Sequence, residues 1–210
     1  MKYQETLEIE KDGRGRATLL ITLPSRAASE SATLKQIEER LAPDPLASGI
    51  RRQIHRRQTE SATELEIAYS FEDIASFCAW AAQTSSPLNN LSVVRDGRHV
   101  EITRRFSGIS SGDLPSVATA QFDIPVTFSL RAPYEIDVHN GTLVNGNTVT
   151  WEFSARDLLA GSGKTLAARY RVRPSYWLYV FAALLALAAG IVWVRRSRKG
   201  RLPTPKMERA

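Results

Sequence analysis

The sequence predicts an α+β fold, mostly an antiparallel sheet with two or three helices, followed by one C-terminal transmembrane helix. Three observations predict it. Segments of alternating apolar and polar residues recur along the chain and are joined by glycine-containing turns. Two shorter segments carry apolar residues at helical spacing. Finally, residues 175–194 form an uncharged, largely apolar run that is long enough to cross a bilayer at about 1.5 Å per residue. The chain therefore divides into an α+β domain (1–173), a transmembrane helix (174–194) and a basic tail (195–210).

The first predicted elements are a β-hairpin and a helix. Residues 3–10 and 16–24 are expected to be strands around the turn KDGRG at 11–15. The first of these strands is identified by Tyr3, Thr6, Leu7 and Ile9. A helix is expected at 33–42, because its apolar residues share one stripe and two prolines follow it.

The middle of the domain combines strands with a second helix. Residues 46–58 are ambiguous between helix and strand, whereas 62–71 alternate at period two and predict a strand. Residues 72–83 predict a short helix with a buried apolar side. A second hairpin is expected at 91–106, with Asp96-Gly97 at its turn.

The last part of the domain is predicted to be strands. They are expected at 122–133, 134–141, 147–153 and 165–172, with a helical turn at 155–161. Pro125 interrupts the first of them, which indicates an edge strand or a bulge. Trp151 follows a tight turn within a strand, so we expect it to pack in the core.

The net positive charge of the chain comes entirely from its tail. Residues 1–174 contain 21 Lys or Arg and 21 Asp or Glu, whereas 195–210 contain seven Lys or Arg and one Glu. The neutral domain argues against nucleic acid as a partner. A basic tail beside an apolar run is instead typical of a topology signal or an anionic-lipid contact. We expect that role for Arg195, Arg196, Arg198, Lys199 and Arg201.

The predicted span has aromatic residues at both ends, as expected at the two membrane interfaces. They are Tyr176, Trp177, Tyr179 and Trp193. Seven basic residues follow the span within 15 positions and four precede it, which favours a cytoplasmic tail and an extracytoplasmic domain. The opening residues have a strand pattern and not that of a signal peptide, so an export signal would have to lie upstream or to have been removed. The alternative is a tail-anchored protein with a cytoplasmic domain.

One face of the span carries small residues at four-residue spacing. They are Ala182, Ala186 and Gly190. This pattern allows close helix–helix packing in membranes, so other transmembrane helices are candidate partners. An alanine-rich span without a partner is the alternative.

No motif in the chain predicts an enzyme, a metal site or a cofactor. Gly163-Lys164-Thr165 resembles the end of a P-loop, but the required first glycine is Leu158 and a strand-like segment follows, so nucleotide binding is not expected. The three histidines are scattered, and a zinc site needs three or four converging ligands. Cys78 is the only cysteine and fits a small core residue.

Two charged segments have both a structural and a functional interpretation. The run RRQIHRR at 51–57 is either a solvated face balanced by nearby glutamates or a contact for lipid headgroups or an acidic partner. Glu64 and Glu66 share one strand face, where we expect them to be solvated and not a catalytic pair.

The order of these segments resembles the LppM-like domain of bacterial envelope lipoproteins and single-pass membrane proteins. The resemblance is carried by KDGRGR, FEDIASF at 71–77 and, most specifically, YEIDVHNGTLVNGNTVTWEF at 134–153. It implies an extracytoplasmic α+β domain tethered to the membrane, and lipid or glycolipid binding has been suggested for the founding type. Members typically begin with a lipid-modified cysteine, where this chain has Met1. The family offers no catalytic residues to carry over.

The sequence therefore predicts a non-enzymatic, membrane-anchored envelope protein. Its domain would bind lipid or a protein partner at the membrane surface, and an apolar pocket is expected between helix 72–83 and the sheet. The alternative is an accessory structural subunit of a larger membrane complex that packs through its transmembrane helix. Membrane lipids are the expected partners in either case.

Overall fold

The computed structural model describes residues 1–24, 35, 38, 45–84, 87–106, 124–159, 163–172, 183–187 and 189. Contacts divide the chain into a compact unit, Met1–Val172, and a second unit, Arg173–Ala210. The predicted span at 175–194 lies mostly outside the described residues, and those of its residues that are described, 183–187 and 189, are helical. Within the described part of the chain, no helix has both the length and the apolar character needed to cross a membrane.

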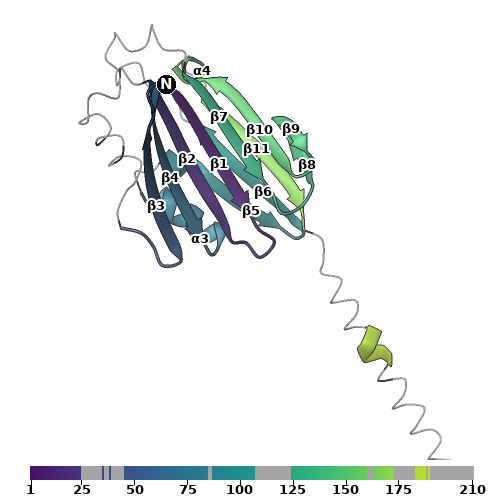
Figure 1. The fold of residues 1–210 in the computed structure, drawn as a ribbon. Coiled ribbons are helices and arrows are strands. Elements are labelled where there is room, and N and C mark those ends of the chain that lie inside the picture. Colours follow the sequence, from purple (N-terminus) through teal and green to yellow (C-terminus); the bar gives the residue numbers. More distant parts are fainter. Residues whose placement is uncertain are drawn as a thin grey trace, which may run out of the picture. The chain divides into compact units, whose positions relative to one another are not determined.

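The compact unit contains a seven-stranded sheet, sheet A, in the order β3-β4-β2-β1-β7-β10-β9 (Figure 1). Neighbouring strands are antiparallel except for β1 and β7, which are parallel. The strands are β1 (Lys2–Ile9), β2 (Gly15–Pro24), β3 (Ile50–Gln58), β4 (Ala62–Phe71), β7 (Pro125–Arg131), β9 (Thr142–Asn145) and β10 (Thr148–Ser154).

A second layer, formed by a four-stranded sheet and a helix, packs against one face of sheet A. Sheet B has the order β5-β6-β11-β8 and is antiparallel throughout. Its strands are β5 (Leu91–Asp96), β6 (His99–Phe106), β8 (Ile136–His139) and β11 (Lys164–Arg171). The helices are α3 (Ile74–Ala82), α4 (Ala155–Leu159) and the 3₁₀ turn η1 (Pro87–Asn90). One hydrophobic core joins both sheets and α3.

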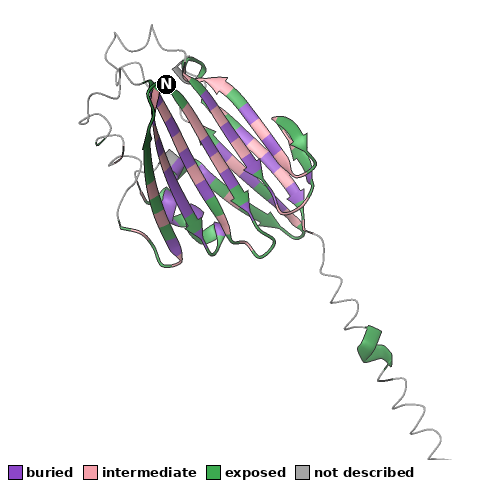
Figure 2. Ribbon diagram, in the orientation of Figure 1, coloured by how far each residue is buried: buried purple, intermediate pink, exposed green. Residues whose placement is uncertain are grey.

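Alternation of residue type explains why these segments are strands. Along β2, every second residue from Ala17 to Leu23 is buried and the residues between them are partly exposed, as Figure 2 shows for most of sheet A. Successive strand side chains point to opposite faces, so one face of sheet A is apolar and the other is polar.

The helix α3 covers sheet A with aromatic side chains. Asp73 caps its N-terminus by accepting a hydrogen bond from the Ser76 amide at 2.7 Å. Phe77 stacks on Phe71 with ring centroids 4.6 Å apart. Trp80 packs against Tyr69 with ring centroids 5.4 Å apart. These rings fill the space between the helix and the sheet. The apolar pocket expected there is therefore not found among the described residues.

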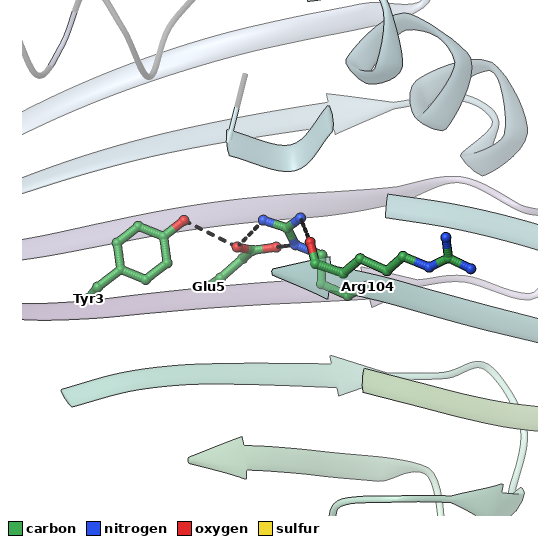
Figure 3. Close-up of polar contacts among 4 residues, drawn as sticks. Tyr3, Glu5 and Arg104 are labelled. Carbon is green, nitrogen blue, oxygen red and sulfur yellow. Dashed lines mark hydrogen bonds and ion pairs between the residues drawn. The ribbon is translucent and has the colours of Figure 1, made fainter. Parts of the chain in front are cut away.

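A buried ion pair links the two sheets. Glu5 projects inward from β1 and Arg104 projects inward from β6, with Nε to Oε1 at 2.9 Å and Nη2 to Oε2 at 3.3 Å. Their side chains are 1% and 3% exposed. Tyr3 donates its hydroxyl to Oε2 of Glu5 at 3.1 Å, and Arg104 also donates to the carbonyl of Arg105 (Figure 3). Burial, reinforced by the Glu5 carboxylate, raises the pKa of Tyr3 well above its usual value, so this hydroxyl remains a donor.

Asn140 joins the two sheets at a second place, where β8 leads towards β9. Its Oδ1 accepts from the Trp151 indole at 2.8 Å and from the Ala167 amide at 2.9 Å. Its Nδ2 donates to the Thr165 carbonyl at 2.8 Å. The side chain therefore bonds to β11 and to a tryptophan of β10, and we call this arrangement the Asn140 clamp. Gly141 is required beside it, because a Cβ at this position would lie 2.6 Å from the Trp151 ring.

The structure confirms several predictions and corrects others. The mostly antiparallel α+β fold, the buried Trp151 and the buried Cys78 are confirmed. The ambiguous segment 46–58 contains β3. The helix expected at 33–42 lies outside the described residues, apart from helical 35 and 38.

One expectation about the strands is wrong, and the structure adds two details. Pro125 marks neither an edge nor a bulge, since it is the first residue of β7, a position where no interior ladder bond is lost. The strand expected at 134–141 is the shorter β8, and β9 follows it. Thr6 lies on the partly exposed face of β1, whereas Glu5 is buried beside Leu7.

Replacing Gly141 by alanine is expected to destabilise the domain by about 1–3 kcal/mol, because the added methyl group overpacks the Trp151 contact. Chemical unfolding followed by tryptophan fluorescence measures the change. Gly146→Ala is the matched control, since its Cβ would meet only Glu135 Cγ at 3.7 Å. An equal loss in both variants would contradict the role of the close contact.

Cys78 is expected to resist thiol reagents while the domain is folded. Burial, with a smaller contribution from the charge of Asp73, raises the pKa of its thiol to about 12, and the thiolate is the reactive form. Alkylation followed by mass spectrometry at mildly alkaline pH should label the thiol only after denaturant is added. Rapid labelling of the native protein would show that the site is open.

Candidate functional site

The residues predicted to act in the membrane are almost all outside the described residues. This holds for Ala182 and Gly190, for the four interface aromatics and for the five basic residues that follow the span. Only Ala186 is described, as an exposed helical residue. Their predicted roles stay predictions from the sequence.

The other sequence candidates lie apart from one another. Lys164, from the incomplete P-loop, begins β11, where its Nζ lies 3.4 Å from Asp157 Oδ2 and 5.1 Å from the Phe153 ring centroid. His55, His99 and His139 lie on three different strands. No group of three or more metal-ligating side chains occurs in the part of the chain that the structure describes.

The arginine run at 51–57 forms most of β3, one of the two edge strands of sheet A. Charged side chains on an edge strand discourage pairing with other chains. Arg57 lies opposite Glu64 in the neighbouring strand, and His55 lies opposite Glu66. Glu66 also pairs with Arg16 at 3.1 Å, so these glutamates are balanced by basic neighbours on a solvated face.

Arg51 belongs to a different arrangement, a row of side chains across the polar face of sheet A. The strand registers align one residue from each of five neighbouring strands. In order across the sheet, the row is Arg131, Glu8, Arg16, Ser70 and Arg51. The row therefore crosses five strands, and all of its members are exposed. It carries three arginines and one glutamate.

The turn between β1 and β2 adds to this row and creates a hollow of about 880 Å³, which we call the basic hollow. Gly13, at φ +90°, allows the tight turn, which brings Lys11 and Arg14 beside the row. The lining residues are Glu8, Ile9, Glu10, Lys11, Arg14, Gly15, Arg16, Gly49, Arg51, Ser70, Phe71, Glu72, Arg131, Ala132, Pro133 and Asn147.

The basic hollow has five cationic and three anionic side chains in its lining. Some of its cations already have partners. Arg14 contacts Asp12 at 2.6 Å, which lowers the pKa of that carboxyl, and Arg131 lies 3.7 Å from Glu8. Lys11 and Arg51 make no ion pair with any other described residue. An anionic group of moderate size is the ligand that this charge balance suits best.

A second hollow of about 750 Å³ lies beside the Asn140 clamp, between β9, β10 and β11. Trp151, Phe153 and Leu166 contribute to its lining, together with Lys164 and several polar residues. Trp151 is only 7% exposed and its indole nitrogen is already bonded to Asn140. This hollow therefore offers less unsatisfied polar surface than the basic hollow.

Sequence reasoning identified the members of the basic hollow only as turn or strand residues. KDGRG was assigned to a turn, and Arg51 was grouped with arginines that do not line the hollow. The available signal was the density of basic residues at one hairpin turn. Arg131 joins the basic residues of this hairpin only because β1 pairs in parallel with β7, which brings together residues far apart in the sequence.

Comparisons with known proteins agree with this architecture. The family model of the LppM domain matches residues 2–170. Among solved structures, the chain resembles the NMR structure of the folded domain of the Mycobacterium tuberculosis LppM protein. The two are 14% identical, with a TM-score of 0.53, and the match covers 83% of this chain and 91% of that one. No curated protein matches the sequence. The chain belongs to the LppM domain family.

Proposed function

We propose that this protein is a non-enzymatic, membrane-anchored component of the bacterial envelope whose domain binds anionic lipid headgroups. The observation that carries the proposal is the basic hollow, with its row of Arg16, Arg51 and Arg131 and the adjacent Lys11. The site would position a negatively charged group through charge and hydrogen bonding, and it carries no motif that predicts bond cleavage.

The family and the sequence support a membrane location. LppM is a lipoprotein family, which favours association with the envelope. The apolar run at 175–194 and its basic flank are consistent with a single span. An extracytoplasmic domain with a cytoplasmic tail is the orientation that we propose, on the excess of basic residues after the span.

The packing of the domain favours a headgroup over an acyl chain as the recognised part of the lipid. The space between α3 and sheet A is occupied by the rings of Tyr69, Phe71, Phe77 and Trp80. The basic hollow, in contrast, is open and mostly polar. A charged headgroup matches such a surface, since each basic residue near an anionic membrane surface contributes about 1 kcal/mol.

Packing through the membrane helix is a second candidate function, and it rests on the small-residue stripe of Ala182, Ala186 and Gly190. It would make the protein an accessory subunit of a larger complex. The two proposals are compatible, because they use different parts of the chain.

Removing a cation from the basic hollow is expected to weaken the binding of an anionic lipid. Arg51→Ala should lower the affinity for short-chain phosphatidylglycerol about fivefold, the effect of losing roughly 1 kcal/mol. The full chain in a non-ionic detergent is titrated by calorimetry, and short-chain phosphatidylcholine, which has no net charge, should bind more weakly.

Arg57→Ala is the matched control for that titration. Arg57 lies on the same strand and the same face as Arg51, but it does not line the hollow. It is expected to leave the affinity unchanged. Equal binding of the two lipids, or equal losses in the two variants, would contradict the assignment of the site.

A further inference from the structure

The chain contains two Asn-Gly pairs that differ sharply in their surroundings. Asn140-Gly141 lies between β8 and β9, and Asn145-Gly146 begins the turn between β9 and β10. Asn-Gly is the dipeptide in which the following backbone nitrogen most readily attacks the asparagine side chain, because glycine places no side chain in the way. The two pairs therefore have similar intrinsic reactivity, and the fold makes their reactivity differ.

Asn140 is held in place by its own side chain. Its amide makes three hydrogen bonds, to Trp151, Ala167 and Thr165, all at 2.9 Å or less. Its backbone N–H also donates to the Ala167 carbonyl at 3.2 Å. Attack on its side chain requires these bonds to break first, so the clamp opposes the reaction.

Asn145 lacks these constraints. It is exposed, as is Gly146, and its side chain makes no hydrogen bond with any other described residue. The residues of β9 are all exposed, and the strand forms the edge of sheet A. Its pairing with β10 is irregular between Thr148 and Val149. Short edge strands of this kind open locally at low cost.

We propose that Asn145 is a site of spontaneous deamidation and that the Asn140 clamp protects Asn140 from the same reaction. The Gly146 backbone nitrogen gives its proton to solvent base and forms a bond to Cγ of Asn145. The side-chain nitrogen leaves as ammonia, producing a cyclic succinimide. Water then opens either carbonyl of the ring and yields aspartate or isoaspartate.

The product differs from the parent protein in charge and backbone. A carboxylate appears two residues before Asn147, which lines the basic hollow. In the isoaspartate product the main chain also gains a carbon at the turn from β9 to β10. That turn, which belongs to sheet A, is attached to β8 of sheet B, since the Gly146 carbonyl accepts from the Ile136 amide at 2.7 Å.

Peptide mapping by mass spectrometry tests the proposal on the full chain, incubated at mildly alkaline pH. Asn145 should convert at least about tenfold faster than Asn140 in the folded protein, since three hydrogen bonds hold the latter. In denaturant the two rates should become similar, because the dipeptides are the same. Intact Asn145, equal native rates, or an Asn140 that stays intact after unfolding would each overturn the proposal.

Gly146→Ala provides a variant that tests the chemistry without disturbing the fold. A Cβ there would meet only Glu135 Cγ at 3.7 Å, and Gly146 has no positive φ that would disfavour alanine. The added methyl group should slow conversion at Asn145 severalfold by hindering the attacking nitrogen. An unchanged rate would show that the mass change does not arise through the succinimide.

Discussion

The buried ion pair between Glu5 and Arg104 is the contact that constrains the two-layer arrangement most strongly. Each charge lies on the inner face of a different sheet, in a mostly apolar core, and both are almost fully shielded from water. Such a pair is tolerated only if both partners remain together, because an unpaired buried charge costs several kcal/mol. It therefore disfavours any packing in which β1 and β6 slide relative to one another.

Other contacts also hold the two sheets together. The guanidinium of Arg104 also lies 4.3 Å from the Phe106 ring centroid, and Phe106 meets Phe153 of sheet A edge to face. The Asn140 clamp forms a second link between the sheets, since it ties Trp151 of β10 to β11. With the sheets joined at both places and aromatic rings under α3, the polar face of sheet A is left to interact with ligands. This is why we propose headgroup binding on that face.

The extent to which the sequence predicts this protein depends on whether a feature is local. Alternation and turn residues predicted most strands, and apolar residues at helical spacing predicted α3, because these patterns depend on neighbouring residues. Glu5 and Arg104 were missed, although each interrupts an apolar series at period two, Tyr3-Glu5-Leu7 and Ile102-Arg104-Phe106. Their pairing, the parallel contact of β1 with β7, and the hollow that follows from it join residues distant in the sequence. The motif at 134–153 was noticed as a resemblance, and the clamp now gives Asn140, Gly141 and Trp151 a physical role.

A double-mutant cycle on the ion pair tests the central claim most directly. Glu5→Gln and Arg104→Met are made singly and together, and the free energy of unfolding is measured for each variant by chemical denaturation. Each single variant should lose about 3–5 kcal/mol because it leaves a buried polar group or charge without its partner. The double variant should lose no more than either single one, which gives a large coupling energy. Single losses below about 1 kcal/mol that simply add would contradict the claim that this pair fixes the two sheets together.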